Sequence, residues 1–321
     1  MRKFFTLLVF LLALLLLSPL TALTKNPLSS PVLAENTTSS QPQKLNPETE
    51  NFKVLISDTN ETVTLTREEY IFGVIAGEMP ALYEPEALKA QAVCAYTFLK
   101  WRQKENSDKP YDITDNFQVD QCYIKKEKAL EKWGSNADEY SEKIENAIES
   151  VKGQALYYDG EIILSVYHAV SAGITESAKN VWGKDYPYLQ SVSSIGDKLA
   201  TNYITTATAT KEKIEECFSV TVPSGLKGTF ADFKRTNSGY VKEVKICGKE
   251  FSGSKVREAL GLKSTNFSVA IKDNVFTFNV YGYGHGVGMS QNGANYMAQQ
   301  GSDYKEILTH YYKGSEIMRN S

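Results

Sequence analysis

Hydrophobic positions recur at two spacings along this chain, and the spacing predicts which segments are helices and which are strands. Between residues 67 and 79, the apolar side chains of Ile71, Val74 and Ile75 fall on one stripe of a 3.6-residue repeat, which predicts a helix with a buried face. Residues 62–66 alternate apolar and polar side chains, which is typical of a half-buried strand. Further helices are predicted at residues 85–103, 138–152, 291–300 and 304–312, and further strands at residues 52–56, 155–158, 161–167, 241–246, 267–271 and 275–281. Because helices and strands mix without a repeating βαβ period, the predicted fold class is α+β, with mixed helices and antiparallel strands in one globular unit.

Local signals support several of these boundaries. Pro85 suits the first turn of the helix at residues 85–103, where a missing N–H is tolerated. Asp159 and Gly160 favour positive φ and predict a hairpin turn between the strands on either side. Ser290 is the predicted N-cap of the helix that starts at Gln291.

The N-terminal residues predict a location outside the cytoplasm for the rest of the chain. Two basic residues precede a nearly continuous apolar run over residues 4–23, which is long enough to cross a bilayer with its positive flank inside. A cleaved signal peptide is the alternative, because the strongest apolar core of this run is shorter than a typical spanning helix. We expect a single-pass cell membrane anchor at residues 1–23, a disordered tether at residues 24–50 and an extracytoplasmic domain at residues 51–318.

Composition and charge limit the size of the core and the classes of partner that the chain is expected to bind. The 321 residues are 42% hydrophobic and 23% charged, which is enough to bury one large core or two small ones. The formal net charge of −3 provides no basic footprint, so nucleic acid is not an expected partner.

Glu78 is the candidate with the clearest chemistry. It follows Ile71, Val74 and Ile75 at helical spacing, so it points along the same apolar stripe, and it lies in the last helical turn before Pro80. Burial and the negative end of the helix dipole both favour the protonated carboxylic acid. A carboxylic acid that keeps its proton near neutral pH suits a general acid in glycosidic bond cleavage. The alternative is an ordinary helix-terminal glutamate that bends out to solvent.

Several longer motifs occur in a recognisable order. Residues 77–80 read Gly-Glu-Met-Pro, residues 86–93 read Glu-Ala-Leu-Lys-Ala-Gln-Ala-Val, and residues 284–294 read Gly-His-Gly-Val-Gly-Met-Ser-Gln-Asn-Gly-Ala. Between them, residues 167–173 and 181–192 are similar to further landmarks of the same family. Together these motifs resemble the SpoIID/LytB family of lytic transglycosylases.

The resemblance implies a function and a site. Glu78 matches the catalytic glutamate of the family, which cleaves the MurNAc-GlcNAc bond of peptidoglycan glycan strands in a central groove and leaves a 1,6-anhydro product. The sporulation members of the family act during engulfment of the forespore. The resemblance also implies two partners, SpoIIP, which removes stem peptides, and SpoIIM, a membrane scaffold. Strands without stem peptides are then the expected substrate.

A substrate-binding set follows from the matched positions. It comprises Lys89, Tyr96, His168, Ser171, His285 and Gln291. Lys89 matches a family position that contacts substrate hydroxyl or carboxylate groups, and the alternative is a solvated helix lysine. His285 is either a site residue or a structural histidine that bonds the loop backbone, and His168 is more typical of a structural role or of support for the site.

The glycine-rich segment before residue 291 predicts a close backbone approach. Gly284, Gly286 and Gly288 alternate, which removes the side chains from one face of the chain and lets the backbone approach a flat ligand. We expect this loop to border the groove that contains Glu78, with His285 or Gln291 holding the sugar or the acid.

Tyr96 departs from the family pattern, which usually has Arg in Ala-Ala-Arg-Thr-Tyr, whereas residues 94–98 here read Cys-Ala-Tyr-Thr-Phe. A phenol cannot replace a guanidinium that grips an acidic group. Either another residue supplies the charge or the activity is reduced. We expect Tyr96 to face the groove.

The four cysteines do not predict a metal site. Cys94 lies among apolar helix positions and is expected to be a buried free thiol, whereas Cys217 and Cys247 could pair. Some relatives carry Cys and His zinc ligands near the position of Cys122, but residues 112–122 hold one Cys and no His, and Asp115, Asp120 or a distant His would be needed to complete a set. No metal and no cofactor are expected.

The number of candidate carboxylates favours one mechanism. Hydrolytic glycosidases usually need two carboxyl groups, whereas a lytic transglycosylase can use one as acid and then as base. Glu84, Glu86 and Asp197 are the candidates for a second acid, and none has an independent argument. The competing interpretation is a non-catalytic glycan-binding or scaffold protein of the same fold that acts with a partner hydrolase.

Overall fold

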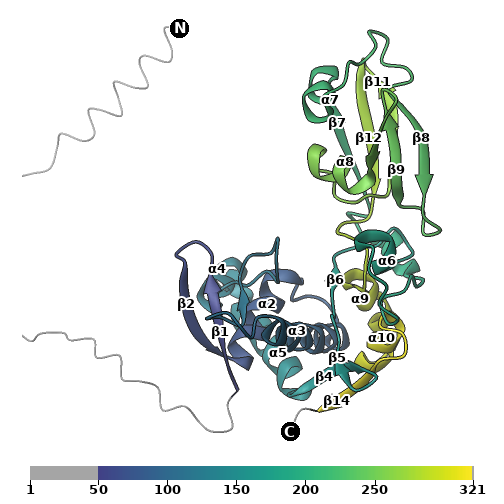
Figure 1. Cartoon of the computed structure of the whole chain (residues 1–321). Coiled ribbons are helices and arrows are strands. Elements are labelled where there is room, and N and C mark those ends of the chain that lie inside the picture. Colours follow the sequence, from purple (N-terminus) through teal and green to yellow (C-terminus); the bar gives the residue numbers. More distant parts are fainter. Residues whose placement is uncertain (1–49, 320–321) are drawn as a thin grey trace, which may run out of the picture. The chain divides into compact units, whose positions relative to one another are not determined.

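The ordered elements of this chain are short strands and helices that mix along the sequence (Figure 1). The structure, a computed structural model, describes residues 50–319, which belong to one compact unit, Asn46–Ser321. The helices are α2 (Arg67–Glu78), α3 (Pro85–Glu105), α4 (Lys126–Trp133), α5 (Ala137–Ser150), α6 (Ala178–Trp182), α7 (Lys211–Phe218), α8 (Gly253–Leu260), α9 (Gln291–Gln299) and α10 (Tyr304–Tyr311), with 3₁₀ turns at η1 (Gly134–Asn136) and η2 (Ile195–Leu199). The predicted α+β class is therefore confirmed.

Within residues 50–319, the strands form five small sheets. The first sheet has the order β2 (Glu61–Thr66), β1 (Asn51–Ile56), β3 (Ile113–Thr114), and another has the order β14 (Glu316–Arg319), β4 (Gln154–Tyr158), β5 (Glu161–Ile162). Two further sheets have the orders β10 (Lys249–Ser252), β9 (Val241–Ile246), β8 (Phe230–Arg235) and β11 (Phe267–Lys272), β12 (Val275–Tyr281), β7 (Ile204–Ala209). The last pairs β6 (Tyr167–His168) with β13 (Met289–Ser290). The pairs β1·β3 and β6·β13 are parallel, whereas the other strand pairs in these sheets are antiparallel.

Helix α3 is central to the larger hydrophobic core. Pro85 occupies its first turn as predicted, and a nearly unbroken run from Ala87 to Leu99 is buried. The helix contacts α2, α5, α9, α10 and β4, which are elements from distant parts of the sequence. Because α2 and α9 both pack against this helix, Glu78 at the end of α2 and Gln291 at the start of α9 can lie in one site.

A second hydrophobic core lies between residues 207 and 280. It is formed by apolar side chains of α7, α8 and the sheets β10-β9-β8 and β11-β12-β7, such as Ile214, Val244, Phe267 and Phe278. Figure 1 shows these elements gathered together in green. The alternating pattern of β12 explains its place, because Phe276, Phe278 and Val280 are buried while the residues between them are partly exposed.

Most predicted elements lie within a few residues of their observed bounds, with one error in the hairpin. Asp159 and Gly160 have φ values of 50° and 78°, as the predicted turn requires. The strand after the turn ends at Ile162 rather than at residue 167. Tyr167 pairs instead with Met289 in the parallel pair of β6 and β13, because tertiary contacts redirect the chain after Ile162.

The membrane predictions fall mainly on residues that the structure does not describe. The predicted anchor at residues 1–23 and the tether up to residue 49 lie outside the described residues. Between residues 50 and 319, no helix is long and apolar enough to span a bilayer.

Candidate active site

Glu78 is the last residue of α2, one residue earlier than the predicted helix end. Thr66 and Glu69 form a capping box at the start of this helix, and the stripe of Ile71, Val74 and Ile75 is buried as predicted. Glu78 itself is partly buried, and its Oε1 accepts a hydrogen bond from the backbone N–H of Cys122 at 2.8 Å. Burial raises the pKa of Glu78 above its usual value, although hydrogen bonds with the Cys122 backbone and the side chains of Gln291 and Tyr167 oppose the shift. The predicted direction of this pKa shift is confirmed.

Glu78 lines a pocket of about 690 Å³. The wall contains Glu78 and Gly77 from α2, residues 117–122 from the loop after β3, residues 166–169 around β6, Trp182, Tyr283, Gly284, His285, Gln291 and Phe98. Three of the aromatic side chains are exposed to solvent, with exposed fractions of 71% for Phe117, 44% for Trp182 and 40% for Tyr283. Exposed aromatic rings beside a polar pocket are suited to stacking on the apolar face of a sugar ring.

The predicted loop and the acid therefore meet in this pocket. Of the six residues of the predicted substrate-binding set, His168, His285 and Gln291 line it together with Glu78. Ser290 is the N-cap of α9, as predicted, because its Oγ accepts a hydrogen bond from the Gly293 N–H at 3.2 Å. The cap places Gln291 at the first position of the helix, where it is buried and hydrogen bonds with Glu78. Its Nε2 also donates to Oε1 of the buried Gln91 at 3.5 Å.

Both histidines of the pocket are neutral. Burial lowers the pKa of His168 to about 4 and the pKa of His285 to about 3. The His168 Nδ1 lies 3.0 Å from the Val287 carbonyl oxygen, so this nitrogen carries the proton. The His285 Nδ1 instead accepts a hydrogen bond from the Val287 N–H at 3.1 Å. The centres of the His285 and Trp182 rings are 5.4 Å apart. His285 thus combines a place in the pocket wall with a bond to its own loop.

The glycines of this loop pack against protein rather than leaving an open backbone face. A Cβ atom on Gly284 would lie 2.7 Å from the His168 Cβ, and one on Gly286 would lie 2.8 Å from the Tyr240 hydroxyl. At Gly288, with φ of 72°, a Cβ atom would lie 2.0 Å from the Val166 carbonyl oxygen. Other segments of the protein therefore fill the space beside these glycines, while Gly284 also lines the pocket, so the close approach of this backbone to a ligand stays a prediction.

Two predicted residues lie outside the pocket wall. Lys89 pairs with Glu86 one turn earlier on α3, with 2.5 Å between Nζ and Oε1. Ser171 is fully buried, and its backbone N–H donates to Oδ2 of Asp197 at 2.9 Å. Neither contacts the pocket that contains Glu78, so their proposed contact with substrate has no support from this arrangement.

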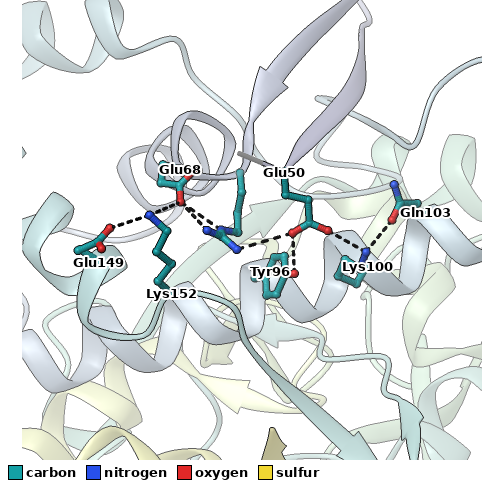
Figure 2. A network of polar contacts seen from close by, with 8 residues as sticks. Glu50, Glu68, Tyr96, Lys100, Gln103, Glu149 and Lys152 are labelled. Carbon is teal, nitrogen blue, oxygen red and sulfur yellow. Dashed lines mark hydrogen bonds and ion pairs between the residues drawn. The ribbon is translucent and has the colours of Figure 1, made fainter. Parts of the chain in front are cut away.

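Tyr96 also lies away from this pocket, in a polar network shown in Figure 2. It is 2% exposed, and its hydroxyl donates to Glu50 Oε2 at 2.7 Å. Lys100 Nζ donates to the other oxygen of Glu50 at 2.9 Å, and the Arg67 guanidinium lies 5.6 Å from the centre of the Tyr96 ring. The expected groove-facing position of Tyr96 is thus replaced by a buried one at the start of the domain. Arg67 supplies a guanidinium beside the position where the family usually has Arg.

Two of the candidate second acids, Asp197 and Glu86, have structural partners. Asp197 is fully buried and accepts hydrogen bonds from the Ser171 N–H and from Ser290 Oγ at 2.9 and 2.7 Å. Glu86 pairs with Lys89, and neither it, Glu84 nor Asp197 lines the pocket. The other carboxyl group in the pocket wall is Asp120, whose side chain is buried in an ion pair with Arg102.

The cysteines are free thiols in this structure. Cys94 is fully buried, as predicted, and Cys217 and Cys247 do not form the disulfide that their positions left open. Within residues 50–319, no group of three or more His, Cys, Asp or Glu side chains is placed to hold a metal ion. Burial raises the pKa of the Cys122 thiol, which keeps its proton beside Glu78.

Sequence reasoning missed Gln121, a buried polar residue in the wall of the pocket that contains Glu78. Gln121 is 2% exposed, its Oε1 accepts from the Tyr167 hydroxyl at 2.9 Å, and its Nε2 donates to the Tyr70 hydroxyl at 3.2 Å and to the Ala95 carbonyl at 3.3 Å. The signal that could have found it is its position one residue before Cys122 in a polar segment. That signal has no meaning until the loop is placed against α2.

Comparisons with known proteins place this chain in one family. Residues 56–158 match the family model described as SpoIID, stage II sporulation protein. The chain is 38% identical over 253 residues to stage II sporulation protein D of Bacillus amyloliquefaciens, covering 78% of this chain and 73% of that protein. It is also 38% identical over 256 residues to stage II sporulation protein D of Bacillus subtilis (strain 168), covering 78% of this chain and 74% of that protein. A protein named amidase enhancer from the same strain is 29% identical over 301 residues, which are 76% of this chain and 40% of that protein.

Proposed function

Because this chain belongs to the SpoIID family, we propose that it is a peptidoglycan lytic transglycosylase that cuts glycan strands during forespore engulfment. The observation that carries the proposal is Glu78, a carboxyl group in a pocket whose burial raises its pKa. The pocket wall holds one other carboxyl group, that of Asp120, and Arg102 already neutralises it. A single available acid fits transglycosylation better than hydrolysis, which usually needs two.

The reaction would use Glu78 twice. As a carboxylic acid, it protonates the glycosidic oxygen while the bond from that oxygen to C1 of the MurNAc residue breaks. The 6-hydroxyl of the same sugar then attacks C1 and closes the 1,6-anhydro ring, and its proton passes to the Glu78 carboxylate. The acid is restored, and no water is consumed.

The rest of the pocket would bind the glycan. Phe117, Trp182 and Tyr283 would offer exposed rings for sugar stacking, and Gln291 lines the same pocket beside the acid. His168 and His285 are uncharged, so they leave Glu78 without a cationic partner that would lower its pKa. The proposal also places the catalytic domain outside the cytoplasm, anchored by residues 4–23, with SpoIIP and SpoIIM as partners.

A second candidate function is a non-catalytic role. The similarity to a protein named amidase enhancer favours it, because that name describes help to another enzyme. In this case, the chain would bind glycan and promote cleavage by a partner hydrolase.

Product analysis separates the two functions. Purified full-length protein is incubated with glycan strands that carry stem peptides and with strands that lack them, and the products are identified by mass spectrometry. Fragments with 1,6-anhydro ends, formed without a partner, are expected for the transglycosylase. Intact strands together with faster cleavage by an added amidase would instead support the non-catalytic role.

A further inference from the structure

Glu176, in the segment between β6 and α6, has a buried side chain that binds the start of α6. The residue is 1% exposed, and it lies outside the wall of the Glu78 pocket. Its Oε1 accepts hydrogen bonds from the Ser177 N–H and from Asn180 Nδ2, both at 2.8 Å. Ser177 is the N-cap of α6, and Asn180 lies within the helix. The Glu176 carboxyl group therefore fixes the first turn of α6.

The backbone of Glu176 is bound to the loop that contains His285. Its N–H donates to the Gly286 carbonyl oxygen at 2.7 Å, and Glu176 forms a parallel β-bridge with Val287. Trp182 is the last residue of α6, and its ring lies beside the His285 ring in the pocket wall. Glu176 thus joins the two segments that place these rings in the pocket.

Helix α6 depends on such contacts for its orientation. It has five residues, which is far fewer than an isolated helix needs to be stable in water. The Trp182 side chain is 44% exposed, so only part of its ring packs against protein. Loss of the hydrogen bonds at the first turn of α6 should therefore change where the Trp182 ring lies.

The second oxygen of Glu176 is bound from the part of the protein that forms the second hydrophobic core. Its Oε2 accepts a hydrogen bond from Thr236 Oγ1, and Thr236 belongs to the turn between β8 and β9. In the same turn, Ser238 Oγ lies 3.1 Å from Ser191 Oγ, which donates to Glu176 Oε1 at 3.4 Å. The β8–β9 turn is therefore connected to α6 through one carboxyl group.

We propose that Glu176 is a positioning residue for glycan binding, which sets Trp182 beside His285 in the pocket wall and is itself held by Thr236 of the β8–β9 turn. The assignment deepens the proposed function and rests on it, because the place of Trp182 matters only if the pocket binds glycan. Glu176 does not contact the substrate in this scheme. Glu78 keeps its surroundings, so the effect is expected on binding rather than on the chemical step.

The first test observes Trp182 without any substrate. Full-length protein labelled with ¹⁵N at the indole nitrogens gives NMR signals from three tryptophans, and Trp182→Ala identifies the Trp182 signal. Glu176→Met keeps a side chain of similar length without the carboxyl oxygens. In this variant, the Trp182 signal should shift or broaden, whereas the signals of Trp101 and Trp133 should stay in place.

Thr236→Val is a milder variant with a matched control. It removes the hydroxyl that binds Glu176 and should move the Trp182 signal in the same direction as Glu176→Met. The control, Thr229→Val, removes another hydroxyl near the second core, one that donates to the Leu226 carbonyl oxygen at 2.7 Å, and should leave the Trp182 signal unchanged. If Glu176→Met does not fold in a thermal melt, Thr236→Val decides. An unmoved Trp182 signal in either folded variant, or an equal shift in Thr229→Val, would overturn the proposal.

The second test measures the kinetics on glycan strands without stem peptides. In Glu176→Met, KM should rise about tenfold with kcat nearly unchanged, because the stacking ring is displaced while the acid is not. Glu176→Gln keeps an oxygen for Ser177 and Asn180, so its KM should stay within about threefold of the wild-type value. In a Trp182→Ala background, Glu176→Met should raise KM no further. A further rise there, or a fall in kcat with KM unchanged, would overturn the proposal.

The two tests separate this inference from the proposed function. If the protein binds glycan but cuts none, the same changes are measured by calorimetry in the dissociation constant, and the positioning role stands while the transglycosylase fails. If the protein is active but the Trp182 signal does not move in Glu176→Met, the role of Glu176 fails while the transglycosylase stands.

Discussion

Replacement of Glu78 by Gln separates acid chemistry from packing. The amide oxygen of Gln can accept the Cys122 N–H bond that Glu78 accepts at 2.8 Å, and the uncharged amide has nearly the same shape as the protonated acid. The fold should therefore persist. Turnover should fall by about two to four powers of ten, because the leaving group loses its proton donor.

The same substitution has a predicted effect on stability, and its sign follows from the pKa. The folded state raises the pKa of Glu78 above its usual value of 4.5, so between these two values the folded state binds more protons than the unfolded state. The wild-type protein therefore loses stability, relative to the neutral Gln variant, as the pH rises through this window. Each unit of pKa shift is worth about 1.4 kcal/mol, and each kcal/mol moves Tm by about 2–4 °C in a domain of this size.

The assay is a series of thermal melts from pH 4 to pH 8 with a parallel measurement of glycan products. At pH values below the usual pKa of a glutamate, the Tm values of the two proteins should differ least. As the pH rises, the Tm of Glu78→Gln should increase relative to that of the wild type until the pH exceeds the folded-state pKa. Glu316→Gln, an exposed position on β14, serves as the control and should change neither quantity. A Tm difference that does not vary with pH would refute the raised pKa. A folded variant with more than about a tenth of the wild-type activity would refute Glu78 as the acid.

Three further substitutions test other parts of the structure. Tyr96→Arg should lower the free energy of unfolding by several kcal/mol, and Tm with it, because a second guanidinium would be buried beside Arg67. A Tm equal to that of the wild type would show that the new side chain reaches solvent. Gly288→Ala should prevent folding or lower Tm far more than Gly301→Ala, since both have positive φ but only Gly288 has a carbonyl oxygen at 2.0 Å from the added Cβ atom; equal melts would contradict this. Trp182→Ala, at an exposed ring of the pocket, should raise KM for glycan about tenfold with Tm nearly unchanged; an unaltered KM would remove it from the binding surface.

The local elements of the site were predictable because their signals are short-range. The capping box of Thr66 and Glu69 and the apolar stripe of α2 define the helix that ends at Glu78. Pro85 and Ser290 mark the starts of α3 and α9 in the same way. Burial of the α2 stripe alone was enough to indicate the direction of the pKa shift at Glu78.

Elements with weak local patterns were missed. Strand β7 reads Ile-Thr-Thr-Ala-Thr-Ala, which offers little contrast between its two faces, and it forms because it pairs with β12. Strand β6 has only two residues, and its partner β13 lies more than a hundred residues away. Pairings of this kind have no signature within one segment, since the energy comes from contacts between segments.

The fate of individual polar side chains was decided by tertiary structure. The resemblance alone placed Tyr96 in the groove, but the packing of α3 against the start of the domain buries it beside Glu50 and Arg67. Gln121 has its hydrogen-bond partners only because Tyr167 and Ala95 approach it from two other elements. The sequence by itself determined which helix would carry the acid and why that acid would resist ionisation, because helix periodicity and desolvation act on neighbouring residues. Which groups surround the acid depended on the folded structure, because a hydrogen bond needs donor and acceptor within about 3 Å and only the tertiary fold sets such distances between remote segments.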